Sequence, residues 1–160
     1  TDAVLFGDNG VVPMLKQGAL VIACATMPPE FAKQMEAQCN AADVHYLDAP
    51  ISGGSIKAAN GQLSFMASGT PDAFSAARPA LEATGETVFE LGDAAGAGSA
   101  MKAVNQLLAG VHIVTMAEAL TFGMTQGVTP EKFVEVISKC AGTSWMLENE
   151  SLRRALKARY

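Results

Sequence analysis

The stretch GALVIACATMPPEFAKQMEAQCNAADVHYLD, residues 18–48, sets the pattern of the first half of the chain. It opens with a short apolar run, residues 18–24, whose length and composition are typical of a buried strand. Helix-forming residues follow over 28–42, with prolines near the start, where a helix tolerates them. A second apolar run, residues 44–48, predicts another strand. Strand, helix and strand in this order indicate a parallel α/β sheet.

The same alternation continues further along the chain. Residues 62–68 alternate polar and apolar side chains, which predicts a third strand, and residues 87–91 predict a fourth. Residues 71–83 predict a helix between them. The glycine-bearing segment 52–61 is expected to form a loop with a short helix. The fold class expected for residues 1–95 is therefore α/β.

After Gly92 the pattern becomes helical. Residues 98–126 contain no proline and many alanines, leucines and methionines, which predicts one long helix of roughly 40 Å. This helix is apolar on nearly all sides, so we expect partners to bury it. Thr129 and Pro130 predict the N-cap and first residue of a second helix, continuing over 131–140, and residues 145–160 predict a third.

The two parts also differ in charge. Residues 1–95 carry four basic and eleven acidic side chains, a net charge of −7, whereas residues 96–160 carry seven basic and five acidic, a net charge of +2. We place the domain boundary between them. The whole chain of 160 residues has a net charge of −5, which argues against binding to nucleic acid or to an anionic membrane surface. No uninterrupted apolar run reaches the roughly 18 residues of a membrane span.

The cysteines do not form a metal or disulfide pattern. Cys24, Cys39 and Cys140 are widely spaced, no CxxC pair occurs, and there are only two histidines. A structural zinc site needs four closely paired ligands, so we expect no metal. Three unpaired cysteines predict reduced, buried thiols in a cytoplasmic protein.

One candidate site is the segment DAPISGG, residues 48–54. A strand ends at its aspartate, the proline prevents continuation, and Ser52, Gly53 and Gly54 follow. Glycines allow successive backbone N–H groups to converge on one point, which suits a carboxylate, and the Ser52 hydroxyl adds a donor. The segment also follows the carboxyl end of a strand, where open α/β sheets bind ligands. The alternative is an ordinary glycine-rich turn.

The second candidate is GAGSAMKAVNQ, residues 96–106. Lys102 and Asn105 are three residues apart, so on a helix they share a face that is otherwise apolar. Burial would lower the pKa of the lysine toward the range that a general base requires. Asn105 can both donate and accept hydrogen bonds. The alternative is a lysine whose amine reaches solvent beside a hydrogen-bonded core asparagine.

Together, these two segments resemble the β-hydroxyacid dehydrogenase family, which includes 3-hydroxyisobutyrate dehydrogenase and relatives of 6-phosphogluconate dehydrogenase. The first segment, with Ala58, Gly61 and Met66 after it, matches the family's substrate motif, and the second matches its Gly-x-Gly-x-x-x-Lys-x-x-Asn catalytic motif. The resemblance covers residues 3 to 149. It implies that Lys102 is the acid/base group, that Asn105 orients the substrate, and that the Ser52-Gly53-Gly54 loop holds the substrate carboxylate.

The resemblance also implies a cofactor. Thr26 matches the family threonine that contacts it near the nicotinamide ribose, and the cofactor implied is NAD, with NADP not excluded. The family's Gly-x-Gly-x-x-Gly phosphate motif is missing from this sequence. We therefore expect a partial Rossmann-like sheet lacking its first strands, the C-terminal part of a dinucleotide-binding α/β domain over 1–95. An incomplete all-α substrate and dimerisation domain, opened by a long interdomain helix, is expected over 96–160. Without the phosphate cradle, the isolated chain is expected to be weakly active or inactive.

The implied function is hydride transfer from a small hydroxy acid, of the L-threonate or 3-hydroxyisobutyrate type, to a nicotinamide cofactor. Residues 105–112 and 144–149 look most like the branch of the family that oxidises L-threonate. The expected assembly is a homo-oligomer formed through the helical part. The alternative is a non-catalytic fragment that acts as an oligomerisation or scaffold module, because apolar helices and an open sheet edge both need partners.

Overall fold

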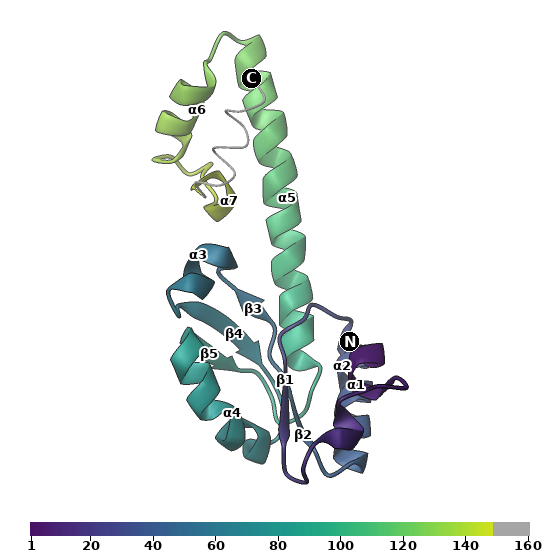
Figure 1. Cartoon of the computed structure of the whole chain (residues 1–160). Coiled ribbons are helices and arrows are strands. Elements are labelled where there is room, and N and C mark those ends of the chain that lie inside the picture. Colours follow the sequence, from purple (N-terminus) through teal and green to yellow (C-terminus); the bar gives the residue numbers. More distant parts are fainter. Residues whose placement is uncertain (149–160) are drawn as a thin grey trace. The chain divides into compact units, whose positions relative to one another are not determined.

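The computed structural model describes residues 1–148 (Figure 1). The chain forms two compact units, one over residues 1–104 and the other from Asn105 onward. The helices and strands, in chain order, are α1 (Asp2–Phe6), the 3₁₀ helix η1 (Val12–Met14), β1 (Leu20–Ala23), α2 (Pro29–Ala41), β2 (His45–Asp48), β3 (Ile51–Ser52), α3 (Gly54–Ala59), β4 (Leu63–Ala67), α4 (Pro71–Thr84), β5 (Gly85–Glu90), α5 (Ala97–Thr125), α6 (Pro130–Ile137) and α7 (Trp145–Glu148).

The first unit contains the predicted strand–helix–strand pattern. β1 and β2 pair in parallel, with Leu20 opposite His45 and Ala23 opposite Asp48, and α2 connects them. β4 and β5 also pair in parallel, and α4 connects these two. These crossovers confirm the predicted α/β class, because a parallel pair of neighbouring strands needs a crossover connection.

The two strand pairs are linked by the segment after β2. β3 is a two-residue strand that pairs antiparallel with β4, placing Ile51 opposite Phe65 and Ser52 opposite Ser64. A bridge between Asp48 and Ser68 joins the ends of β2 and β4. The predicted short helix is α3, whereas β3 was not predicted, since two residues are too few to show an alternating pattern.

Two apolar cores lie on opposite sides of the strands. Tyr46 and Leu47 are neighbours on β2, and their side chains point to opposite faces, as the strand repeat of two requires. Tyr46 belongs to the core that contains Met35 of α2, and Leu47 to the core that contains Phe74 of α4. Figure 1 shows α2 and α4 on either side of the strands. The sheet is therefore covered on both faces, as expected of parallel strands.

The helical unit has a small core of its own. Its buried residues are Met116, Leu120, Phe133 and Leu147. The Thr129 side chain accepts a hydrogen bond of 3.3 Å from the backbone N–H of Lys132, which confirms the predicted cap at the start of α6. That helix ends at Ile137, three residues before the predicted end. Of the predicted third helix, α7 forms the first turn, and the remainder lies outside the described residues.

The long helix α5 is confirmed at 29 residues, one residue earlier at each end than predicted. Many of its apolar side chains are exposed within the chain; they include Met101, Val104, Leu107, Leu108, Val111, Ile113, Val114, Phe122 and Met124. By length and composition alone, α5 is also apolar enough to cross a membrane. Among residues 1–148, much of this helix therefore has no covering side chains.

The buried-thiol prediction is correct for only one cysteine. Cys39, on α2, is buried in the core, whereas Cys24 and Cys140 are exposed. Cys24 directly follows β1, where the chain leaves the sheet, and Cys140 lies past the end of α6. All three thiols are free.

Candidate active site

The Lys102 side chain lies in the first unit, near the start of α5. It is buried, with 9% of its surface exposed, and its Nζ donates a hydrogen bond of 2.7 Å to the carbonyl oxygen of Ile51. Burial lowers the pKa of the Lys102 amine from its ordinary value. Ile51 immediately precedes Ser52, so the amine lies at the start of the predicted substrate loop.

The Ser52-Gly53-Gly54 loop has a backbone that only glycine adopts readily. Gly53 and Gly54 have φ values of 129° and 66°, which are positive and unfavourable for other residues. A Cβ on Gly53 would also come within 2.7 Å of the Lys57 Cβ, whereas one on Gly54 would meet open space. Ser52 is half-buried, at the end of β3. This sharp turn between β3 and α3 gives the loop a defined shape.

The loop leaves the sheet from the same edge as the segment that carries Thr26. Ala23 and Asp48 are register partners at the carboxyl ends of neighbouring parallel strands. Thr26 follows the first by three residues and Ser52 follows the second by four. Thr26 is exposed in the connection to α2. The carboxyl edge of a parallel sheet is where α/β proteins bind their ligands.

A buried carboxylate joins this edge to the start of α5. Asp48 is fully buried, and its oxygens accept hydrogen bonds from the backbone N–H groups of Gly96 and Ser99 and from the Ser99 hydroxyl. Ser68, also fully buried, accepts one from the Gly98 N–H. The sequence alone indicated no individual role for Asp48, Ser68 or Ser99. A carboxylate that ends a strand, followed later by a helix rich in glycine and serine, is the only signal that could have indicated this network.

Asn105 begins the second unit, three residues after Lys102 on α5. It is half-buried, and its side-chain amide donates a hydrogen bond of 3.2 Å to the side-chain oxygen of Gln106. The i, i+3 spacing on one helix is thus present. Its contact with substrate stays a prediction.

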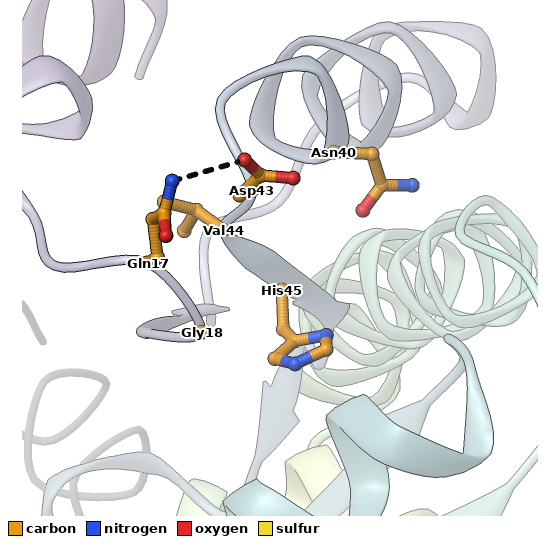
Figure 2. Close-up of a pocket in the computed structure, with 6 residues that line it drawn as sticks. All are labelled: Gln17, Gly18, Asn40, Asp43, Val44 and His45. Atoms are coloured by element: carbon orange, nitrogen blue, oxygen red, sulfur yellow. Dashed lines mark hydrogen bonds between the residues drawn. The ribbon is translucent and has the colours of Figure 1, made fainter.

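A separate hollow lies at the opposite, amino end of the first two strands (Figure 2). It has a volume of about 480 Å³ and is lined by Gln17, Gly18, Asn40, Asp43, Val44 and His45. The Gln17 amide donates a hydrogen bond of 3.4 Å to the Asp43 carboxylate there. None of the predicted site residues lines it, and the carboxyl edge remains the better candidate. Among residues 1–148, no cluster of three or more His, Cys, Asp or Glu side chains could hold a metal ion.

Two family models match the chain in succession. Residues 1–92 match the NAD binding domain of 6-phosphogluconate dehydrogenase. The chain belongs to the β-hydroxyacid dehydrogenase family. Residues 96–160 match the NAD-binding segment of NADP-dependent 3-hydroxyisobutyrate dehydrogenase. The second match extends past residue 149, where the resemblance was expected to end.

Similarity to individual proteins supports the membership of the chain in the β-hydroxyacid dehydrogenase family. L-threonate dehydrogenase from Cupriavidus necator is 48% identical over 149 residues, which are 93% of this chain and 50% of that protein. The crystal structure of a 3-hydroxyisobutyrate dehydrogenase from Salmonella typhimurium is 37% identical with a TM-score of 0.93, over 99% of this chain and 55% of that one. The structure of Psf3 in complex with NADP+ and 2-OPP is 29% identical with a TM-score of 0.86, over 94% and 52%. The chain therefore spans about half the length of these relatives.

Proposed function

We propose that the protein is a dehydrogenase that oxidises a small hydroxy acid with NAD or NADP, and that Lys102 is its general base. The observation that carries this proposal is the buried Lys102 amine, held 2.7 Å from the Ile51 carbonyl at the start of the Ser52-Gly53-Gly54 loop. A base must lie within hydrogen-bond reach of the proton that it removes. A substrate held by the loop would present its hydroxyl close to this amine.

The chemistry of Lys102 fits that role. A lysine must be neutral to accept a proton, and burial shifts its pKa in the required direction. In the proposed reaction, the substrate O–H bond breaks as its proton passes to the Lys102 nitrogen, and the carbinol carbon becomes a carbonyl. A bound nicotinamide would supply the acceptor for the hydride from that carbon.

The carboxylate of the hydroxy acid is assigned to the Ser52-Gly53-Gly54 loop. The two positive φ values turn the backbone sharply, so that successive N–H groups can face one anion. The Ser52 hydroxyl supplies a further donor. Asn105, on the same helix as Lys102, would orient the substrate through its amide.

The cofactor's nicotinamide end is assigned to the neighbourhood of Thr26. The fit rests on position, since Thr26 is exposed at the carboxyl end of β1 and Ser52 follows the end of the adjoining parallel strand. A hydroxyl there can donate to or accept from a ribose hydroxyl. Binding measurements with NAD and with NADP separately distinguish the two cofactors.

Among hydroxy acids, we propose L-threonate first and 3-hydroxyisobutyrate second. The order follows the 48% identity to an L-threonate dehydrogenase and the 37% identity to a 3-hydroxyisobutyrate dehydrogenase. Both compounds carry one carboxylate and at least one hydroxyl, which the loop and Lys102 would bind together. Measuring the rate of oxidation of each acid decides which of the two is the substrate.

We also propose that the helical part forms a homo-oligomer. The exposed apolar side chains of α5 include Leu107 and Phe122, each 68% exposed. Burying such side chains against a second copy is favourable, at about 25 cal/mol per Å² of apolar surface. This explains the apolar composition of α5 without a membrane. A cytoplasmic location fits the three free thiols.

A non-catalytic scaffold module is not favoured. A module that only associates has no need for a buried lysine, because burying a charged amine costs free energy that a leucine would not. Nor does it need a left-handed glycine pair beside that lysine. Both features are explained by a substrate site.

Thermal unfolding of a purified protein that carries the complete dinucleotide-binding domain tests the proposal directly. We expect NAD or NADP to raise the unfolding temperature, and L-threonate to raise it further only when the cofactor is present, because a ligand that binds the folded state stabilises it. 3-Hydroxyisobutyrate serves as the second substrate, and isobutyrate, which lacks its hydroxyl, as the matched control. No shift with any cofactor or acid would contradict the dehydrogenase and favour the module.

A further inference from the structure

We propose that Asp48 is a positioning residue for Lys102: its carboxylate fixes the first turn of α5 against the ends of β2 and β4, and thereby holds the Lys102 amine beside the Ser52-Gly53-Gly54 loop. The catalytic meaning of this placement rests on the proposed function, but the placement itself concerns only residues of the first unit. Asp48 lies in the segment that resembles a substrate motif. Its contacts, however, are with the helix.

The Asp48 carboxylate is surrounded by donors from the start of α5. One oxygen accepts from the Gly96 N–H at 3.0 Å and from the Ser99 N–H at 2.8 Å. The other accepts from the Ser99 hydroxyl at 2.7 Å. The Ser68 hydroxyl lies 3.4 Å from the first oxygen and accepts from the Gly98 N–H at 2.9 Å. Two strand ends thus provide the hydrogen-bond acceptors for the first turn of the helix.

These contacts explain how a buried charge is tolerated there. None of the ion pairs among residues 1–148 involves Asp48, so its negative charge is balanced by hydrogen bonds. The first N–H groups of a helix have no partner within the helix and carry a partial positive charge. Hydrogen bonds from several of them compensate a buried carboxylate for its lost contacts with water. The helix start and the carboxylate therefore satisfy one another.

Gly98 lets the helix approach closely enough for this network to form. A Cβ at this position would collide with the main-chain oxygens of Met66 and Asp48. The helix thus begins in direct contact with the backbone of the two strand ends. A close backbone contact of this kind leaves little freedom for α5 to shift or rotate.

Asp48 is connected both to the donor and to the acceptor of the Lys102 hydrogen bond. Its main chain leads in three residues to Ile51, whose carbonyl accepts from the Lys102 amine. Its side chain holds Ser99, which is three residues before Lys102 and on the same face of α5. Both partners of the lysine hydrogen bond are therefore fixed to one residue. A substitution of Asp48 should therefore change the position and the solvent exposure of the Lys102 amine.

The titration of Lys102 tests this without any assay of activity. We would follow the side-chain carbon and nitrogen resonances of isotope-labelled lysines by NMR across alkaline pH, assigning Lys102 with a Lys102→Gln variant. In the native protein, Lys102 should titrate below the other lysines. In Asp48→Ala, the loosened amine reaches water, and its midpoint should rise toward the ordinary ~10.5. In Asp48→Asn, which keeps an acceptor oxygen, the rise should be smaller.

The direction in which the Lys102 midpoint changes separates the competing explanations. If Asp48 acted only as a nearby negative charge, removing it would disfavour the protonated amine and lower the Lys102 midpoint in both variants. If it served only overall stability, the midpoint would stay unchanged while the unfolding temperature fell. Either result overturns the proposal. Asp93→Asn is the control, since it removes one negative charge at an exposed position of the segment before α5 and should leave Lys102 unchanged.

Ser99→Ala keeps the test valid if Asp48→Ala does not fold. It removes only the hydroxyl bond of 2.7 Å and retains the backbone bond. We expect a smaller rise of the Lys102 midpoint in this variant. An unchanged midpoint would contradict the proposed positioning role of Asp48. The NMR titration reports on Lys102 itself and needs no substrate. Failure of the proposed function in an activity assay is therefore distinguishable from failure of the proposed role of Asp48.

Discussion

The Lys102 amine and the Ile51 carbonyl are joined by a 2.7 Å hydrogen bond, although 51 residues separate them in the sequence. The acceptor is a main-chain oxygen that stays uncharged at every pH. A carboxylate in its place would favour the protonated amine and raise its pKa, whereas here burial dominates and lowers it. The lysine is therefore held in position without an ion pair, which suits a group that must release and accept a proton.

Replacing Lys102 by alanine is the first test of its catalytic role. In the active enzyme, we expect Lys102→Ala to lower kcat by about 10²-fold or more, with a modest change in NAD affinity, because general-base catalysis contributes roughly 10²–10⁴-fold. Lys102→Arg should not restore the rate, since a guanidinium stays protonated. Steady-state kinetics and cofactor titration measure both effects. Lys132→Ala, at an exposed lysine paired with Glu135, should be neutral. An unchanged rate in Lys102→Ala would remove the lysine from the mechanism.

The lowered pKa of Lys102 predicts how oxidation depends on pH. The amine accepts a proton only when neutral, so kcat/KM should rise with pH to a plateau reached below the ordinary lysine value of 10.5. Stability should rise at higher pH, between the lowered pKa of Lys102 in the folded chain and the ordinary lysine value of 10.5. The unfolded chain still holds the proton there and the folded chain has released it, so the free energy of unfolding increases with pH. A rate profile without this limb in the native protein would contradict the assignment, and Lys102→Ala should lack it.

The hydrogen-bond partners within the site are harder to infer from sequence than the helices and strands that carry them. The apolar runs before and after α2 predicted β1 and β2 because a buried parallel strand leaves a continuous apolar signature. Thr129 and Pro130 marked the start of α6 for an equally local reason. The partners of Asp48 lie about 50 residues away in the sequence, so no local pattern could identify them.

The glycine turn after β3 was predicted from the sequence, but its detailed shape was not. Glycines at 53 and 54 predicted a turn, whereas the clash that a side chain at Gly53 would make with Lys57 depends on α3 folding back over it. The exposure of Cys24 was also missed, since an apolar run does not indicate where a strand ends. Local composition thus predicts elements, and contacts between elements require the structure.

Removing the Ser52 hydroxyl should weaken substrate binding more than catalysis. We expect Ser52→Ala to raise KM for the hydroxy acid about tenfold with little change in kcat, because one hydrogen bond to a carboxylate is lost in the ground state and the transition state alike. Steady-state kinetics in both variants measure the split. Ser55→Ala, an exposed serine three residues later, is the matched control. A fall in kcat with KM unchanged would instead place Ser52 next to the reacting atoms.

The two loop glycines should differ in their tolerance of a side chain. Gly53→Ala should lower the free energy of unfolding by roughly 1–3 kcal/mol, because φ is 129° and a Cβ there lies 2.7 Å from the Lys57 Cβ. Gly54→Ala has open space at its Cβ and a φ of 66°, so it should cost about 1 kcal/mol. Urea unfolding of the two variants checks the order. Equal costs would show that the loop relaxes around either methyl group.

The apolar surface of α5 predicts self-association that charge should disrupt. Leu107 and Phe122 are each 68% exposed on this helix. Light scattering at micromolar concentration should therefore show a dimer or a larger species. Leu107→Lys combined with Phe122→Lys should shift it toward monomer, since burying an unpaired ammonium in an interface is costly. Met14→Lys, at an exposed apolar residue outside the helix, should leave the assembly unchanged. A native protein that is monodisperse and monomeric would show that α5 is covered in some other way.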